Sequence, residues 1–216
     1  MKQYQTILFD LDGTLTDPAE GITASFVYAL ENMRLPVPDK KTLTRFIGPP
    51  LLETFERDFS LNASDARKAL RYYREYFGNA GIFENVLYDG IGHLLERLCA
   101  GGKTLLVATS KPEPYAVRIL EHFGIAGFFT YIAGSTLEET RTKKADVIRY
   151  ALSVTGIPAN SNAVMVGDRR HDAEGAKEVG IDSIGVLYGY GTRDELECAG
   201  VTYLAETVNA LEALLI

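Results

Sequence analysis

Four aspartates stand where apolar segments of the sequence end. Asp10 and Asp12 come directly after residues 6–9, and Asp168 and Asp172 follow a second apolar segment. If these ends meet in the fold, their carboxylates repel one another and lose hydration unless a cation joins them, so the pattern indicates a hard divalent metal ion. Magnesium is the expected ion, because it takes a few protein oxygens, keeps several waters and accepts a substrate phosphate as a further ligand.

Hydroxyl and ammonium groups occur at matching positions. Thr109 and Ser110 end a third apolar segment, and the basic pair Lys143 and Lys144 opens the helical pattern that precedes the second acidic segment. A hydroxyl donor and a point charge at one rim would bind phosphoryl oxygens, and Gly13 would let backbone N–H groups approach them closely. Together with the aspartates, these residues predict chemistry on a phosphate group.

The apolar pattern predicts a scaffold that brings these segment ends together. Five short runs rich in strand-forming residues alternate with amphipathic segments of helical period. The runs are residues 6–9, 104–108, 129–133, 163–166 and 183–187. This alternation predicts an α/β fold with a doubly wound, Rossmann-like parallel sheet, in which ligands bind at the carboxyl ends of the strands. A last short strand and a helix are expected between Thr202 and Ile216.

One long segment interrupts the alternation, with helical patterning and no convincing strand. We interpret residues 17–85 as a small α-helical cap domain inserted into the core, which then consists of residues 1–16 and 86–216. The cap contains apolar stripes at helical spacing and a stiff turn at residues 46–51 that includes Gly-Pro-Pro. The tyrosines of the second stripe are spaced for packing within the cap.

Composition and charge exclude several classes of protein. The 216-residue chain has a net charge of −7 and basic runs no longer than pairs, so no nucleic-acid polymer is expected as a partner. No stretch approaches the roughly 18 uncharged apolar residues of a membrane span, and Asp10 precedes any signal-peptide core, so no membrane is expected either. Cys99 and Cys198 lack disulfide or zinc-site spacing, which makes a reducing cytoplasm the expected location.

The combined motifs resemble those of the haloacid dehalogenase-like phosphohydrolases with a helical cap after the first strand. The resemblance covers essentially the whole chain, and within the superfamily the sequence is most similar to the phosphoglycolate phosphatase and nucleotidase branch. The matching segments are Phe9-Asp10-Leu11-Asp12-Gly13-Thr14-Leu15, Thr109 within Val107–Pro112, Lys144, and Gly167-Asp168-Arg169-Arg170-His171-Asp172.

The resemblance implies roles for the first two aspartates. Asp10 would attack phosphorus and become an aspartyl-phosphate, and Asp12 would protonate the leaving oxygen and later deprotonate water. This assignment requires Asp12 to hold a proton well above the pH of roughly 3.9 at which a free Asp titrates. Ionised Asp10 beside a metal ion is a suitable nucleophile, because the metal screens its charge from the phosphate.

The resemblance also implies the ligands of the metal and of the substrate. Magnesium would be held by Asp10, the backbone carbonyl of Asp12 and Asp168, with Asp172 bound directly or through water. Thr109 and Lys144 would bind the phosphoryl oxygens, with Gly13 and Ser110 beside them and Lys143 as the competing lysine. In relatives the turn corresponding to residues 46–51 reaches over the leaving group, so Arg45 and Gly48 are expected substrate contacts.

The leading hypothesis is a magnesium-dependent phosphatase acting on a small phosphomonoester, either a phosphorylated organic acid or sugar or a nucleoside monophosphate. A dehalogenase needs neither the metal nor a proton donor at Asp12. A phosphomutase of the same superfamily would carry a cap histidine where Ile22 stands, which disfavours that alternative without excluding it. A non-enzymatic aspartyl-phosphate switch module would be about half as long and would lack the cap. The protein is expected to be a monomer or a homodimer.

Overall fold

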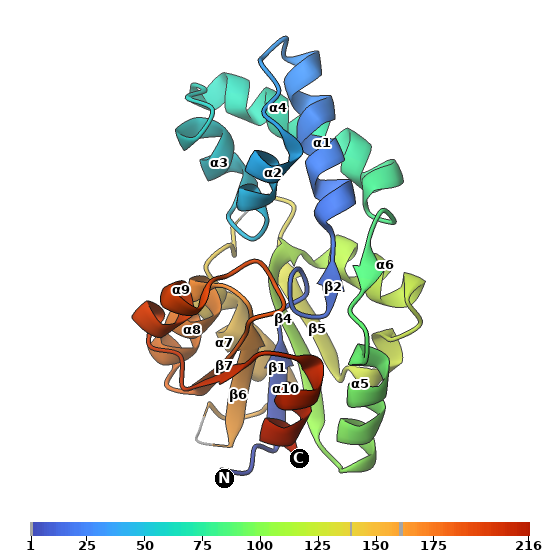
Figure 1. The fold of residues 1–216 in the computed structure, drawn as a ribbon, viewed down its shortest axis with the longest axis vertical. Coiled ribbons are helices and arrows are strands. Elements are labelled where there is room, and N and C mark those ends of the chain that lie inside the picture. The colour runs from blue at the N-terminus through green and yellow to red at the C-terminus, as the bar shows by residue number, and fades with distance from the viewer. Residues whose placement is uncertain (1, 139, 160–161) are drawn as a thin grey trace. The chain divides into compact units, whose positions relative to one another are not determined.

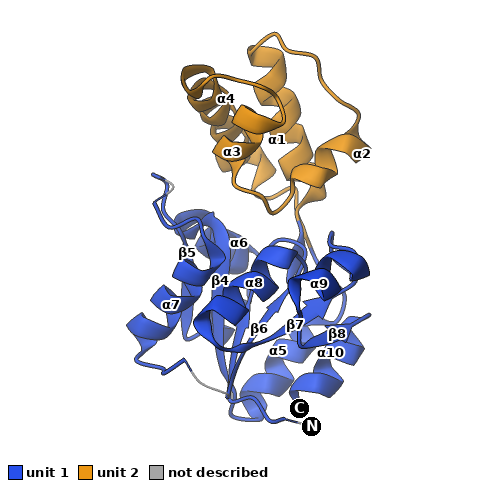
Figure 2. Cartoon of the chain, turned by 90° about the vertical axis from the view of Figure 1, so that its left-hand side faces the viewer, with its two compact units in different colours: residues 1–17, 87–216 blue, residues 18–86 orange. Residues whose placement is uncertain are grey.

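A computed structural model describes residues 2–138, 140–159 and 162–216 of the chain. The chain divides into two compact units, which Figure 2 shows in different colours. Unit 1 contains residues 1–17 and 87–216, and unit 2 contains residues 18–86. The chain therefore leaves unit 1 once and re-enters it once, so that unit 2 is a single insertion.

Unit 1 is built on a six-stranded sheet in which every neighbouring pair of strands is parallel (Figure 1). The strand order is β5-β4-β1-β6-β7-β8. The bounds are β1 Thr6–Phe9, β4 Thr104–Pro112, β5 Tyr131–Ser135, β6 Ala163–Gly167, β7 Asp182–Val186 and β8 Tyr203–Ala205. All four residues of the central strand β1 are buried, which explains why its sequence is an apolar run without alternation.

Helices connect the strands of unit 1, as parallel pairing requires. Their bounds are α5 Ile91–Ala100, α6 Glu113–His122, α7 Lys144–Thr155, α8 Arg170–Val179, α9 Arg193–Ala199 and α10 Val208–Leu215, with a short 3-10 turn η3 at Ala126–Phe128. Val147 and Ile148 of α7 and Ala176 of α8 pack with Leu8 and Met165 of the sheet in one buried cluster. The predicted fold class, a doubly wound α/β sheet, is confirmed.

The register of the sheet brings the ends of three strands level. Phe9, the last residue of β1, is paired with Val107 of β4 and with Val166 of β6. The residues that follow these three positions therefore emerge at the same edge of the sheet. This edge receives the functional segments because parallel strands all point their carboxyl ends in one direction.

Some element boundaries differ from the prediction. β4 continues through Pro112, and its register with β5 shifts between Ala108 and Pro112, so Thr109 and Ser110 lie in the irregular end of the strand. Two further strands, β2 Thr16–Asp17 and β3 Val86–Leu87, form a separate two-stranded sheet where no strand was predicted. Segments of two residues are too short to show the alternation by which strands are recognised.

Unit 2 is helical and has an aromatic core. Its elements are α1 Ala19–Asn32, α2 Lys40–Leu43, the 3-10 turn η1 Thr44–Phe46, α3 Leu51–Arg57, α4 Ala63–Tyr76 and the π-helical turn η2 Phe77–Gly81. The fully buried ring of Phe26 lies 5.1–6.1 Å, centroid to centroid, from those of Phe46, Phe55, Phe59 and Tyr73. None of the described helices of either unit is both long and apolar enough to span a membrane.

Candidate active site

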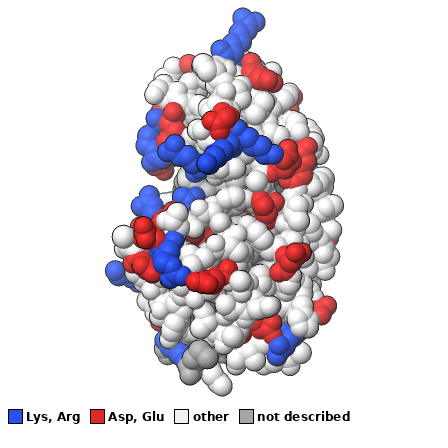
Figure 3. Space-filling view, in the orientation of Figure 1, with Lys and Arg blue, Asp and Glu red and all other residues white. Residues whose placement is uncertain are grey.

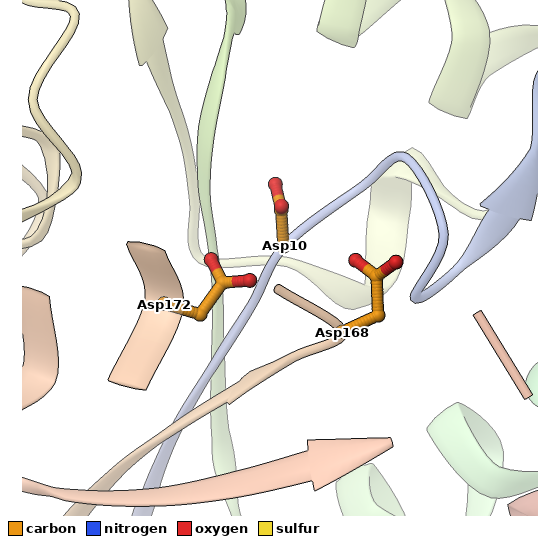
Figure 4. A group of neighbouring side chains, drawn as sticks. All are labelled: Asp10, Asp168 and Asp172. Carbon is orange, nitrogen blue, oxygen red and sulfur yellow. The ribbon is translucent and has the colours of Figure 1, made fainter. Parts of the chain in front are cut away.

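Asp10, Asp168 and Asp172 form a cluster of buried carboxylates at the carboxyl edge of the sheet in unit 1 (Figure 4). One oxygen atom of each lies within 4.8 Å of one oxygen of the others. Asp10 follows β1, Asp168 follows β6, and Asp172 lies in the first turn of α8. The structure thus brings together three of the residues that the sequence predicts as metal ligands.

Asp172 is fixed by the start of its own helix. Its Oδ2 atom accepts a hydrogen bond of 3.1 Å from the backbone N–H of Arg169, and the partial positive charge of a helix N-terminus favours a carboxylate at this position. Gly167 makes room for this side chain, because a Cβ atom on Gly167 would overlap the Asp172 carboxylate.

Asp168 is fixed by a loop that follows another strand. Its Oδ2 atom accepts a hydrogen bond of 2.7 Å from the backbone N–H of Tyr190, beyond the end of β7. Its Oδ1 atom is buried and has no hydrogen-bond donor within the described parts of the chain. Gly13, whose φ is +82°, lies so close that a Cβ atom there would overlap the carboxylate.

Gly13 has a structural role in addition to the one expected, which stays a prediction. Its own N–H donates to the backbone oxygen of Thr16 at 2.8 Å, so it is not turned toward a ligand. Glycine is needed here because the left-handed backbone and the Asp168 carboxylate leave no room for a side chain.

Lys144, the first residue of α7, is the cation of the cluster. Its buried Nζ atom lies 2.9 Å from Asp10 Oδ1, 2.8 Å from Asp172 Oδ1 and 3.0 Å from the backbone oxygen of Ala108. Three acceptors match the three N–H groups of an ammonium. Lys143 precedes the helix and is exposed, so Lys144 is the lysine that the fold places among the carboxylates.

The charges of the cluster do not balance. Burial alone would lower the pKa of Lys144, but Asp10 and Asp172 raise it above its ordinary value, so Lys144 is charged. Burial raises the pKa of Asp168 well above its ordinary value, and the charges of Asp172 and Asp10 raise it further. Burial likewise raises the pKa of Asp172 to about 6 against the opposing charge of Lys144. One ammonium thus faces three carboxylates, which is a site for an additional cation.

The donors of this cluster fit a hard divalent ion. All three side chains offer carboxylate oxygens, the ligands that Mg²⁺ prefers, and Asp168 Oδ1 is a buried oxygen that no described donor satisfies. A cation bound here would offset the repulsion among the three carboxylates and would give Asp168 Oδ1 a partner.

Asp12 lies beside the cluster but has a different partner. Its Oδ2 atom is 2.8 Å from the Nζ atom of Lys111, and the two side chains are 13% and 6% exposed. Burial raises the pKa of the Asp12 carboxyl, although the charge of Lys111 opposes the shift. Asp12 therefore pairs with Lys111. The other three carboxylates are the ones that Lys144 and a bound cation would neutralise.

The two hydroxyl residues at the end of β4, Thr109 and Ser110, differ in their hydrogen bonds. Thr109 is buried, and its Oγ1 atom accepts from the backbone N–H of Lys111 at 3.2 Å, which leaves its hydroxyl proton for another acceptor. Ser110 donates its hydroxyl to the backbone oxygen of Thr142 at 3.3 Å. Of the two, only Thr109 has a hydroxyl proton not used by a described residue.

The two expected substrate contacts of the insertion lie in unit 2. Arg45 is exposed in η1, and Gly48 is half-buried with a φ of 104° in the turn before α3. Their roles toward a substrate stay predictions.

Sequence reasoning missed the loop after β7. The segment Tyr188-Gly189-Tyr190-Gly191 contacts Asp168 and Gly13, and a Cβ atom on either glycine would overlap Asp168. The signal was present, because this segment follows a predicted strand at its carboxyl end, the same position that identified the aspartates. It was missed because it contains no charged group.

The chain belongs to the haloacid dehalogenase-like hydrolase family, whose model matches residues 7–186. This range includes all the predicted site residues. The resemblance seen in the sequence motifs is thereby confirmed, and the carboxylate cluster is the part of the fold in which those motifs meet.

Several relatives that align with nearly the whole chain are named as enzymes that act on phosphate groups. The chain is 45% identical over 213 residues to a 5'-nucleotidase of Pseudomonas aeruginosa, covering 99% of this chain and 96% of that protein. It is 44% identical to tyrosine-protein kinase PtkA of Mycobacterium tuberculosis, covering 98% of this chain and 72% of the relative.

A solved structure of a predicted phosphatase from Clostridium acetobutylicum is also similar to this chain, with a TM-score of 0.94, 45% identity and 98% of each chain covered. The expectation that the protein is an enzyme of the phosphoric monoester hydrolase class is confirmed.

Proposed function

We propose that the protein is a magnesium-dependent phosphatase that hydrolyses a small phosphomonoester through a phosphorylated Asp10. The main support is that the two oxygens of the Asp10 carboxylate have different partners. Its Oδ1 atom accepts from the backbone N–H of Leu11 at 2.8 Å and lies 2.9 Å from Lys144, whereas no described residue donates to Oδ2. The oriented oxygen fixes the side chain, and the unengaged oxygen is the one available to attack phosphorus.

The two steps of this reaction use Asp10 and Asp12 in turn. Asp10 Oδ2 forms a bond to phosphorus, the bond from phosphorus to the ester oxygen breaks, and Asp12 gives its proton to that oxygen. Asp12 then takes a proton from water, the water oxygen bonds to phosphorus, and the bond to Asp10 breaks, which releases inorganic phosphate. The raised pKa of Asp12 supports this role, because a general acid must hold its proton near neutral pH.

Asp10, Asp168 and Asp172 would hold the magnesium ion, with the backbone oxygen of Asp12 as a further ligand. When bound, the ion would neutralise the carboxylates and draw negative charge from the phosphoryl group. The cluster of three buried carboxylates with an unsatisfied oxygen on Asp168 supports this assignment.

Lys144 and Thr109 have separate tasks in this proposal. Lys144 orients Asp10 and Asp172 through its three contacts and provides positive charge beside the phosphoryl group. Thr109 donates its hydroxyl proton to a phosphoryl oxygen. Ser110 and Gly13 support the same rim, Ser110 by its bond to Thr142 and Gly13 by admitting Asp168.

For the substrate, we place a nucleoside 5'-monophosphate first and a phosphorylated organic acid such as phosphoglycolate second. The name of the Pseudomonas relative supports this order. Residues 18–86 would act as the cap that selects the leaving group, with Arg45 and Gly48 as its substrate contacts. On the face drawn in Figure 3, Lys and Arg side chains lie beside Asp and Glu side chains.

The acceptor of the phosphoryl group separates this proposal from its competitors. A phosphatase passes the group from Asp10 to water, a mutase passes it to another hydroxyl of the sugar, and a switch module keeps it on Asp10. The name of the mycobacterial relative adds tyrosine as a fourth acceptor. All four begin with the same residue, so the acceptor has to be measured.

The test is phosphate release from a panel containing nucleoside monophosphates, phosphoglycolate and sugar phosphates, with and without magnesium, on the wild type and on Asp10→Asn. We expect magnesium-dependent release that falls at least about thousandfold in the variant. Asp146→Asn, an exposed carboxylate of α7, serves as the control and should turn over like the wild type.

Two results would overturn the proposal. Release that survives in Asp10→Asn would exclude this residue as the nucleophile. Absence of release from every ester, with the phosphate transferred from ATP to a tyrosine peptide instead, would replace the phosphatase with a kinase.

A further inference from the structure

The loop between β7 and α9 is built around the Asp168 carboxylate. The backbone N–H of Tyr190 donates to Asp168 Oδ2 at 2.7 Å, and the glycines on either side of Tyr190 approach Asp168 too closely for any side chain. The other oxygen, Oδ1, is buried and has no described donor. The loop thus determines which oxygen of Asp168 is engaged by the protein and which one faces the remaining carboxylates.

The side chain of Tyr190 fastens this loop to another part of unit 1. Its phenol donates a hydrogen bond to Oδ1 of Asp17, the last residue of β2. Burial and the neighbouring Asp17 raise the pKa of Tyr190 above its ordinary value, so the phenol keeps the proton that it donates. The residue therefore has two bonds in opposite directions, one from its backbone to Asp168 and one from its side chain to Asp17.

The neighbouring tyrosine fastens the same loop a second time. Tyr188 donates its hydroxyl to the backbone oxygen of Thr14 at 3.1 Å, and its ring packs edge-on against Tyr88 at 5.0 Å. Asp17 is the last residue of unit 1 before the insertion, and Tyr88 follows the first residue after it. The loop is thus attached to both places where the chain crosses between the two units.

We propose that Tyr190 is a positioning residue for the metal site: its hydrogen bond to Asp17 holds the loop so that the backbone N–H fixes Asp168 with Oδ1 toward the cation. In this role Tyr190 acts through Asp168. This inference rests on the proposed function, because it takes the carboxylate cluster to be a magnesium site. It assigns a residue outside the family's sequence motifs to the geometry of that site.

The test measures magnesium binding without substrate, by titration calorimetry, in the full chain. Tyr190→Phe removes only the phenol hydroxyl, and Asp17→Ala removes the acceptor. We expect each to weaken magnesium binding by about fivefold, the effect of one lost hydrogen bond. The double variant should bind no more weakly than either single variant, because both changes delete the same bond.

Two further variants separate the hydrogen bond from charge and from general stability. Asp17→Asn keeps an oxygen acceptor but not the charge, so its magnesium affinity should stay within twofold of the wild type. Tyr131→Phe removes a phenol hydroxyl that bonds Tyr150 elsewhere in unit 1 and should leave magnesium affinity unchanged. Thermal unfolding in EDTA reports any loss of stability that is unrelated to the metal.

The outcomes distinguish this inference from the proposed function. Wild type that binds no magnesium overturns the proposed cofactor and this inference with it. Wild type that binds magnesium, with Tyr190→Phe binding equally well, overturns the positioning role alone. Loss of affinity in Asp17→Asn equal to that in Asp17→Ala also overturns it, because the charge of Asp17 rather than its bond to Tyr190 would then be responsible.

Discussion

The two units of this protein differ in the kind of side chain that they bury. Unit 1 buries four charged side chains, Asp10, Lys144, Asp168 and Asp172, whereas every buried side chain in residues 18–86 is uncharged. Residues 18–86 carry nine basic and nine acidic side chains, so the net charge of −7 belongs entirely to residues 1–17 and 87–216. Unit 2 instead packs aromatic rings around Phe26.

The difference shows what each unit is built for. Burying like charges destabilises a fold unless a ligand compensates them, so unit 1 gives up stability for chemistry at the ends of its strands. An aromatic core contributes stability and shape without reactive groups. Substitutions in the two units should therefore have different signatures, and the following three tests examine that contrast.

The largest effect is expected when the buried cation of unit 1 is removed. Lys144→Met leaves Asp10 and Asp172 without their shared partner, so turnover should fall by about 10³-fold and the metal-free protein should lose about 3–5 kcal/mol of stability. Lys143→Met, at the exposed neighbouring position, should change stability by less than about 0.5 kcal/mol and leave turnover intact. If Lys143→Met lost turnover and Lys144→Met kept it, Lys143 rather than Lys144 would be the lysine required for catalysis.

A purely structural effect is expected in unit 2. Phe26→Ala removes a fully buried ring with four aromatic neighbours and should lower the free energy of unfolding by about 3–5 kcal/mol, measured by urea denaturation. Phe83→Ala, where the ring is 42% exposed, should cost less than about 1 kcal/mol. Similar losses in the two variants would show that the aromatic cluster is not the core of this unit.

The smallest effect is a pH dependence confined to the carboxylate cluster. Burial raises the pKa of Asp172 from its ordinary value of 3.8 to about 6, so its proton stabilises the fold at low pH and this contribution is lost as the pH rises through 6. The metal-free protein should therefore lose about 1 kcal/mol of stability between pH 5 and pH 7, and magnesium should reduce the loss.

A matched pair of variants locates this pH dependence. Asp172→Asn should reduce the loss between pH 5 and pH 7, and Asp168, whose pKa burial also raises, should account for what remains. Asp182→Asn should leave it unchanged: burial of Asp182 is outweighed by hydrogen bonds from Lys2 and Tyr4, so its pKa is lowered and its contribution disappears only at more acidic pH. An unchanged pH dependence in Asp172→Asn would assign the loss to other groups.

The sequence was most informative where long patterns and charged residues coincide. Apolar runs that recur between helical segments indicate the sheet strands, and charged residues that end or adjoin such runs indicate Asp10, Asp168, Asp172 and the pair Lys143 and Lys144. The choice of Lys144 within that pair came from the family resemblance. The sequence pattern does not indicate the short strands β2 and β3 or the extension of β4. They depend on pairing with distant segments, which a local pattern does not record.

The same distinction applies to the site. Residue types and spacing alone determined that carboxylates, a lysine and a hydroxyl would meet at one edge of a parallel sheet, because strand direction fixes where the ends lie. Only the tertiary structure decided that Lys111 pairs with Asp12 and that Tyr190 holds Asp168. Both contacts join residues that lie far apart in the chain, and no periodicity along the sequence specifies which side chains meet when strands and loops pack together.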